Sequence, residues 1–137
     1  MKKSRLIAYL AVIAVLIAAF ALMGASCSVS TANVKNAVMT TAVDENYAPM
    51  DNVSSFPVNS IAYVTADLHN APDDTVVTFK WFMGDQQVDE YVIGNEGNSE
   101  AAIACGTDQI IQPGDYRVEI YIDEREEPDA VAQFTVQ

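Results

Sequence analysis

Histidine and cysteine are the scarcest functional residues of this 137-residue chain, which has one histidine, His69, and two cysteines, Cys27 and Cys105. Two cysteines form one disulfide at most, and these three side chains are too few for the usual four ligands of zinc. Any Ser-His-Asp or Cys-His mechanism would depend on His69. We expect His69 instead to be an exposed side chain without a catalytic role, on the outward face at the end of a strand.

Basic residues are also scarce, with seven lysines and arginines against 19 aspartates and glutamates, a formal charge of −12. Three of the seven precede Leu6, so the rest of the chain carries four against the same 19, a formal charge of −15. Binding to nucleic acid requires a basic surface that neutralises phosphates, so this balance argues against a nucleic-acid partner. Such acidity favours solubility and attracts cations or basic partners, and it also suits a salty habitat.

Catalytic motifs are missing as well: the sequence has no glycine-rich phosphate loop, no HExxH and no GxSxG. Carboxylates occur in pairs, but chance pairs are expected in so acidic a chain. We therefore predict that the protein is not an enzyme. No stretch after Cys27 has helical apolar spacing over three turns, so strands are the expected elements.

The start of the chain has the pattern of a targeting segment. A basic stretch with Lys2, Lys3 and Arg5 precedes 18 uncharged residues, Leu6 to Met23. A basic start and an apolar run before small residues are features of an export signal, and 18 residues is also about the shortest helix that spans a bilayer. In both cases the basic end stays in the cytoplasm and the residues after Cys27 lie outside.

The small residues 24–26 followed by Cys27 resemble the lipobox of bacterial and archaeal lipoproteins, although Gly24 stands where that family most often has leucine. In the family, the cysteine is lipidated and becomes the new N-terminus after cleavage. The resemblance implies a signal peptide over 1–26, lipid on Cys27 and a tether over 27–33, on the extracytoplasmic face of a membrane (cell surface or periplasm). An uncleaved transmembrane anchor and plain secretion are the alternatives.

The remaining residues, 34–137, have the pattern of short strands separated by Pro, Gly and Asp. Period-two alternation predicts inward-facing side chains in four runs. They are Ala62, Val64, Ala66 and Leu68; Val77, Phe79, Trp81 and Met83; Tyr116, Val118, Ile120 and Ile122; and Ala132, Phe134 and Val136. Cys105 is in phase with Ala101 and Ile103, which predicts a buried, inert thiol. About seven strands in roughly 100 residues predict an all-β, two-sheet sandwich.

The order of these features resembles the immunoglobulin-like and fibronectin-III-like domains of microbial surface proteins. Two segments carry the resemblance: 68–91, with a central Trp81, and 113–136, with Tyr116 after a Pro-Gly turn. It implies a single immunoglobulin-like β-sandwich over 34–137, with Trp81 and Tyr116 in its core. It also implies that the Tyr116 hydroxyl bonds back to the preceding turn. This sandwich hosts many unrelated roles, so the resemblance implies little about function.

Two acidic loops are the best candidates for a ligand site. In the immunoglobulin-like topology, the loop between the second and third strands lies at the same end as the last hairpin loop, so seven carboxylates would gather there. Calcium prefers six to eight oxygen ligands. The candidate calcium ligands are Asp73, Asp74, Glu124, Glu126, Glu127 and Asp129, with Asp123 beside them. A solvated acidic edge is the alternative, since the chain has no EF-hand spacing.

Three aromatic residues, Tyr63, Phe82 and Tyr121, are predicted on outward faces. If they lie together, they form an apolar patch for a protein or sugar partner. Scattered surface aromatics are the alternative.

These observations together predict a non-enzymatic domain tethered to the outer face of a membrane, without a cofactor, that acts as a binding, adhesive or structural component of the cell envelope. The expected partners are the membrane, through lipid or the N-terminal helix, and an envelope protein or surface ligand. Two alternatives remain open. One is a calcium- or ligand-binding module that uses the acidic loops, and the other is a filament subunit held together by the apolar helix at 6–23.

Overall fold

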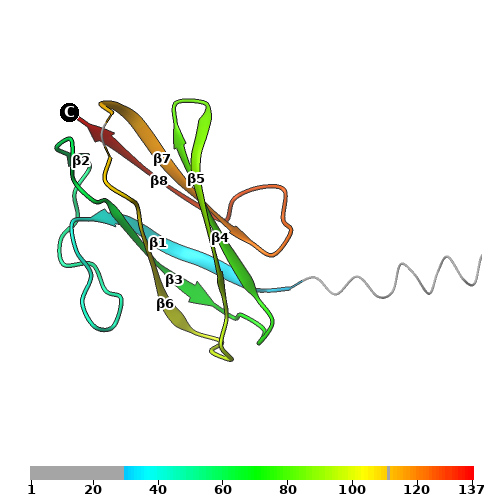
Figure 1. Cartoon of the computed structure of the whole chain (residues 1–137). Helices are drawn as coiled ribbons and strands as arrows, with labels where there is room; N and C mark the ends of the chain where they lie inside the picture. Colours follow the sequence, from blue (N-terminus) through cyan, green and yellow to red (C-terminus); the bar gives the residue numbers. More distant parts are fainter. Residues whose placement is uncertain (1–29, 111) are drawn as a thin grey trace, which may run out of the picture. The chain divides into compact units, whose positions relative to one another are not determined.

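The computed structural model of the chain describes residues 30–110 and 112–137. Within these ranges the chain forms eight strands and no helix, so no helix there is long and apolar enough to cross a membrane. The predicted helix at 6–23 and Cys27 lie outside the described residues. The strands form two sheets (Figure 1).

The first sheet has three antiparallel strands in the order β1-β3-β6, and the second has five in the order β2-β8-β7-β4-β5. In the second sheet, β2 is two residues long and runs parallel to β8, while the other pairs are antiparallel. The strands are β1 (Asn33–Thr40), β2 (Ser55–Phe56), β3 (Tyr63–His69), β4 (Val76–Met83), β5 (Gln86–Gly94), β6 (Ala101–Gly106), β7 (Gly114–Ile122) and β8 (Ala130–Val136).

This strand order is that of an immunoglobulin-like sandwich. Strands β1, β3 and β6 take the places of A, B and E, and β4, β7 and β8 take those of C, F and G. The strand that follows C, here β5, pairs with β4 and leaves β6 at the edge of its sheet. The predicted all-β, two-sheet fold is therefore confirmed. The extra strand is β2, which is too short for alternation to reveal it.

The predicted inward faces form the core. All the residues predicted to point inward in the four alternating runs are buried, except Met83, which is half-buried. Phe134 lies at the centre of an aromatic cluster, with ring centroids 5.4 Å from Phe56, 6.0 Å from Trp81 and 5.3 Å from Tyr116. Trp81 and Tyr116 are thus core residues, as the resemblance implied.

The first strand contains a β-bulge that changes which face its residues occupy. Lys35 pairs with Asp67, but the next pair is Val38 with Thr65, so β1 holds one extra residue. Asn36 lies in the bulge with φ +56°, a left-handed conformation that asparagine tolerates better than most residues. Ala32 and Val34 are buried before the bulge, and Met39 is buried after it, in the opposite phase.

The two ends of the sandwich differ in what they carry. Asn33 at the start of β1 pairs with His69 at the end of β3, so the described chain begins at the end of the sandwich where the loop 70–75 lies. The loops 95–100 and 123–129 lie at this end too, because backbone hydrogen bonds join them to residues 71–76. We call this the entry end. The opposite end, the hairpin end, carries the β4–β5 turn at residues 84–85 and the C-terminal residue Gln137, whose N–H donates to the carbonyl of Phe56.

Candidate binding site

The sandwich has an open side where both sheets end in an unpaired strand. Strand β5 is the last strand of the five-stranded sheet, and β6 is the last strand of the three-stranded sheet. The two lie on the same side, because side chains from both line one cavity and β1, the other edge of the small sheet, packs against β8. We call β5, β6 and the loop 95–100 between them the open side.

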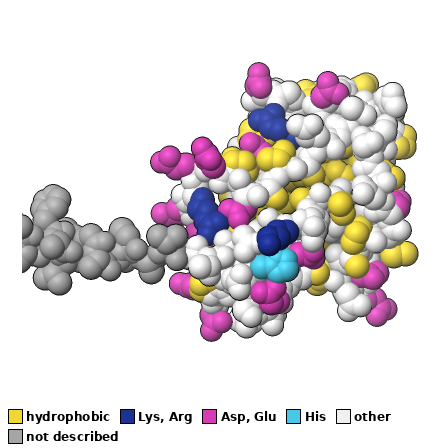
Figure 2. All heavy atoms as spheres, turned by 180° about the vertical axis from the view of Figure 1, so that it is seen from behind, with side chains coloured by type: hydrophobic (Ala, Val, Ile, Leu, Met, Phe, Trp, Pro, Cys, Tyr) yellow, Lys and Arg dark blue, Asp and Glu magenta, His cyan; other side chains and the backbone are white. Residues whose placement is uncertain are grey.

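The open side carries acidic side chains and no lysine, arginine or histidine of its own. Its acidic residues are Asp89, Glu90, Glu96 and Glu100, and Asp108 follows β6; all of these but Asp89 are exposed. Two of them have basic partners on other strands, since Lys80 of β4 is in register with Glu90 and His69 of β3 contacts Glu100. Acidic side chains also occur around the outline of the face shown in Figure 2, where lysine and arginine are fewer. The open side is therefore suited to a cationic group and repels an anionic one.

A cavity of about 320 Å³ opens at the hairpin end of this side. Its buried walls are Trp81, Tyr116 and Phe134, and its more exposed walls include Val88, Asp89 and Asp108. Such an apolar interior with a few polar groups at its rim is the usual form of a small binding pocket. We call it the hairpin-end cavity.

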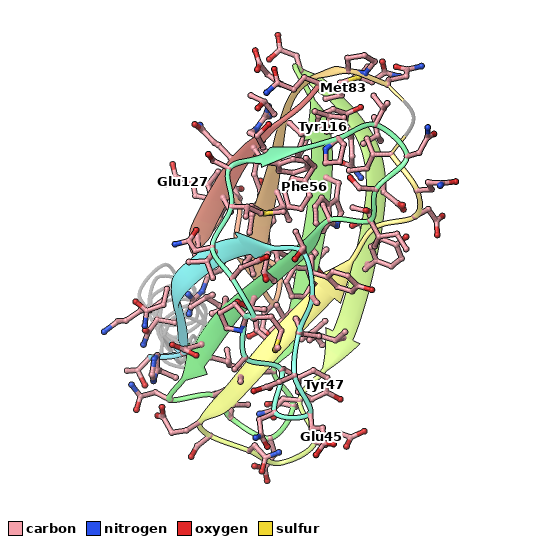
Figure 3. All side chains as sticks on the ribbon, turned by 90° about the vertical axis from the view of Figure 1, so that its left-hand side faces the viewer. Glu45, Tyr47, Phe56, Met83, Tyr116 and Glu127 are labelled. Atoms are coloured by element: carbon pink, nitrogen blue, oxygen red, sulfur yellow. The ribbon has the colours of Figure 1, made fainter. Side chains whose placement is uncertain are left out.

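A second cavity, of about 300 Å³, lies towards the entry end of the open side. Ile93 of β5 and Ile103 of β6 contribute apolar wall, Glu96 contributes a carboxylate, and the ring of Tyr47 borders it. Figure 3 shows Met83 and Tyr116 near one end of the domain and Tyr47 near the other. The two cavities therefore occupy opposite ends of the open side, with β5 running from one to the other.

Asp89 points inward from β5, in register with Trp81. One of its oxygens accepts a hydrogen bond from the Tyr91 hydroxyl at 2.8 Å, and the other accepts from the Glu90 N–H at 2.8 Å. The bond to Asp89 and the burial of the ring together raise the pKa of Tyr91 to about 12. The Tyr91 hydroxyl therefore stays protonated at neutral pH and keeps the Asp89 carboxylate at the wall of the hairpin-end cavity.

Cys105 faces the same interior from β6. Burial raises the pKa of the thiol to about 11. The indole nitrogen of Trp81 is also buried and has no hydrogen-bond partner within the described residues. The prediction that Cys105 is buried is confirmed, and its high pKa makes it a poor nucleophile at neutral pH.

Tyr116 makes the predicted bond to the preceding turn. Its hydroxyl donates to the carbonyl of Gln112 at 2.7 Å. Burial of the ring raises the pKa of this hydroxyl as well. This contact holds the loop that borders the hairpin-end cavity against β7.

The two predicted acidic loops do lie at one end, the entry end, since the Asp123 N–H donates to the Val76 carbonyl and the Val76 N–H donates to Asp123 Oδ1 at 2.9 Å. Asp129 accepts hydrogen bonds from Arg125 at 2.6 Å and from the Val34 N–H at 3.2 Å. The side chains of the other five candidates are exposed, namely Asp73, Asp74, Glu124, Glu126 and Glu127. Across residues 30–110 and 112–137, no three or more Asp, Glu, His or Cys side chains are grouped to hold a metal. The calcium site stays a prediction.

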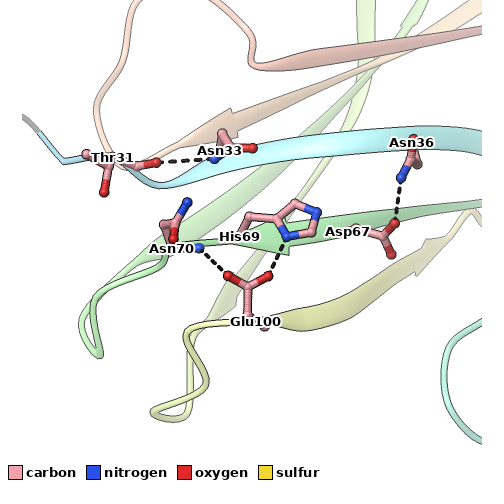
Figure 4. Close-up of polar contacts among 7 residues, drawn as sticks. All are labelled: Thr31, Asn33, Asn36, Asp67, His69, Asn70 and Glu100. Atoms are coloured by element: carbon pink, nitrogen blue, oxygen red, sulfur yellow. Dashed lines mark hydrogen bonds and ion pairs between the residues drawn. The ribbon is translucent and has the colours of Figure 1, made fainter.

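His69 ends β3, as predicted, and its side chain is half-exposed and has a partner. Its Nδ1 contacts Oε2 of Glu100, and the N–H of Asn70 donates to Oε1 of the same carboxylate at 3.0 Å (Figure 4). The Asn70 bond and then the His69 contact lower the pKa of Glu100. Sequence alone missed the pair because 31 residues separate its members. The histidine joins the end of β3 to the start of β6.

Tyr63, Phe82 and Tyr121 do not lie together, which is the alternative of scattered surface aromatics. Tyr63 belongs to the three-stranded sheet, whereas Phe82 and Tyr121 belong to the five-stranded sheet. Arg117 covers the Phe82 ring at 4.2 Å, and Lys80 covers the Tyr121 ring at 4.6 Å. Cation–π contacts therefore occupy two of the three rings.

Comparison with known proteins supports the fold and little else. No protein-family profile matches the chain, and no curated protein matches it. Among solved structures it is similar to the alkylpurine DNA glycosylase AlkC of Pseudomonas fluorescens, bound to DNA containing an abasic site analog. The identity is 11% and the TM-score 0.51, over 79% of this chain and 31% of that chain. The chain thus spans about a third of AlkC, and the likeness shows a shared fold only.

The CARDB domain of the PF1109 protein from Pyrococcus furiosus is less similar. Its crystal structure, in complex with di-metal ions, gives a TM-score of 0.43, with 14% identity over 80% of this chain and 96% of that chain. Its solution structure gives a TM-score of 0.40 at the same identity. Both scores are too low to support a statement about this chain. The described residues form an immunoglobulin-like β-sandwich by their own strand order.

Proposed function

We propose that the protein is a non-enzymatic domain tethered to the extracytoplasmic face of a membrane, with a binding or adhesive role in the cell envelope, and that the open side is its recognition surface. The observation that carries this proposal is the pair of cavities at the two ends of the unpaired strand β5. An immunoglobulin-like sandwich supplies a rigid support for such a surface.

A tether at Cys27 would keep the entry end close to the membrane. Four residues lie between Cys27 and Ala32, which is buried in the sandwich. An extended chain spans at most about 3.5 Å per residue, so lipid on Cys27 would keep the entry end within about 20 Å of its attachment point.

The positions of the reactive side chains support a role in binding. The Cys105 thiol is buried with a pKa of about 11, and His69 is held by Glu100 and lines neither cavity. We do not carry DNA binding over from AlkC, because four basic residues against 19 acidic ones after residue 5 would repel phosphates.

Fractionation of cells that produce the full chain tests the tether. We expect the protein in the membrane fraction after a high-salt wash, and we expect it to be digested by protease added outside the cytoplasmic membrane. The Cys27→Ser variant should lose this association or keep residues 1–26. A protein that is protected from the protease would contradict the proposal. Equal membrane retention of a processed Cys27→Ser variant would contradict the lipid.

A further inference from the structure

We infer that the open side binds an extended, basic segment of a partner protein, which adds a strand to the edge of β5 and inserts side chains into the two cavities. This inference rests on the proposed function and specifies the chemistry of the partner. Three independent features of the open side carry it: a free strand edge, the spacing of the cavities and the charge.

The first feature is the edge of β5. At nine residues it is longer than β6, and only one of its edges is paired, with β4. A bulge at Val88 and the inward Asp89 disturb its first part, and such features discourage indiscriminate edge pairing. From Glu90 to Gly94 the pairing with β4 is regular, so the outer backbone groups of this stretch are presented as a template for one more strand.

The second feature is the spacing of the cavities. Asp89 lines the hairpin-end cavity and Ile93 lines the other, and both point inward from β5. They are four residues apart, which corresponds to about 14 Å along a strand. Side chains at positions i and i+4 of an added strand point to the same face with the same spacing, so one extended segment can fill both cavities.

The third feature is the charge. A partner strand along β5 would meet the carboxylates of Asp89, Glu90 and Glu96, with Asp108 at the hairpin-end cavity. The neighbouring strand β4 holds one basic side chain, Lys80, in register with Glu90. Lysine or arginine side chains fit such cavities, because their methylene stems pack on Trp81, Met83 and Val88 while the charged group reaches Asp89 or Asp108. A second copy of this chain is a poorer occupant, because it would bring two acidic edges together.

A ten-residue peptide of alternating lysine and valine, with blocked ends, is a suitable probe. It is titrated into the full chain in a non-ionic detergent, with fluorescence of Trp81, the only tryptophan, and backbone NMR shifts as readouts. We expect Trp81 emission and the β5 amides to shift, and we expect the affinity to fall with added salt. A peptide of alternating glutamate and valine should not bind.

Two matched triple variants locate the site. Glu90→Gln/Glu96→Gln/Asp108→Asn removes three exposed charges from the open side, and Glu124→Gln/Glu126→Gln/Glu127→Gln removes three exposed charges from the β7–β8 loop. We expect the first to weaken binding about tenfold at low salt and the second to change it less than twofold. Equal weakening would show attraction to net charge alone and would overturn the inference.

Other results also overturn it. Absence of peptide binding would do so, as would binding that leaves the β5 amides unshifted. A stable dimer of the protein that the peptide does not dissociate would assign the edge to a second copy. The membrane fractionation described above is independent of these outcomes, so failure of the tether and failure of the peptide to bind can be told apart.

Discussion

The hydroxyl of Tyr116 supplies one of the few buried side-chain hydrogen bonds of the hairpin end, donated to the Gln112 carbonyl at 2.7 Å. Replacing Tyr116 by phenylalanine removes the donor and leaves the ring, so we expect the free energy of unfolding to fall by about 1–2 kcal/mol. Tyr121→Phe, on the outward face of the same strand, is the control and should cost less than about 0.5 kcal/mol. Urea unfolding followed by Trp81 fluorescence measures both. Equal losses would contradict a stabilising role for the bond.

Cys105 gives a prediction about pH. Burial raises the pKa of its thiol from 9.0 to about 11. The folded protein therefore holds the proton more tightly than the unfolded chain does. The associated stability is fully present below pH 9 and is lost as the pH rises through 11, by about 2–3 kcal/mol.

The comparison between the wild type and Cys105→Ala isolates this effect. The two largest causes of the raised pKa of Tyr91, its bond to Asp89 and burial, are present in both proteins and cancel in the difference of their unfolding free energies. The charge of the Cys105 thiolate also raises the pKa of Tyr91, so this smaller effect remains in the difference and belongs to the buried thiol. We expect that difference to change between pH 8 and pH 11, with the wild type losing more stability. A difference that stays constant over this range would show that the thiol is not buried as described.

At the scale of the elements, the start of β1 is fastened to the β7–β8 loop. Asp129 accepts from the Val34 N–H and from Arg125, and Arg125 also donates to the Ala32 carbonyl at 2.8 Å. We expect Asp129→Ala to lower the free energy of unfolding by about 1–3 kcal/mol, because two part-buried hydrogen bonds to a charged group are lost. Amide hydrogen exchange should accelerate in β1 more than in β4.

The control for this change is Glu127→Ala, since Glu127 is exposed on the same loop. It should leave both the stability and the exchange of β1 amides nearly unchanged. If Asp129→Ala behaves like this control, β1 is held by its pairing with β3 alone. The contact fastens the strand with which the described chain enters the sandwich.

The elements also show what alternation can and cannot predict. Inward faces of β3, β4, β7 and β8 are predictable, because period two records the burial of one face. The facing of β1 is not, since the bulge at Asn36 changes its phase. No local sequence pattern indicates that β5 pairs with β4 rather than with β6. Contacts between residues that are distant in the sequence, such as His69 and Glu100, leave no local pattern either. The acidic run of the open side is visible in the sequence, but its cavities depend on packing.

At the scale of the whole molecule, the surplus of acidic residues sets the response to ions. Self-repulsion at a formal charge of −15 after residue 5 destabilises the compact state, so we expect the melting temperature to rise with sodium chloride. Calcium should give no larger rise than magnesium at equal ionic strength, because Asp123 and Asp129 already accept internal hydrogen bonds. A saturable rise with calcium alone would instead establish the alternative, a calcium-dependent module at the entry end.

The two ends of the molecule have different roles in this account. The entry end receives the chain a few residues after Cys27, and the open side runs from there to the hairpin end. The proposed place of the domain at a membrane depends on the anchor. The anchor is therefore the central claim.

The most direct test of that claim is the intact mass of the protein extracted from host membranes, with its N-terminal residue identified. The account predicts a chain of 111 residues that begins at Cys27 and carries added lipid. A mass that retains Met1 to Ser26 would contradict it and favour a helix-anchored or filament subunit. A chain that begins near Cys27 without lipid would contradict it as well, and would indicate a secreted protein in which Cys27 and Cys105 are both free to pair.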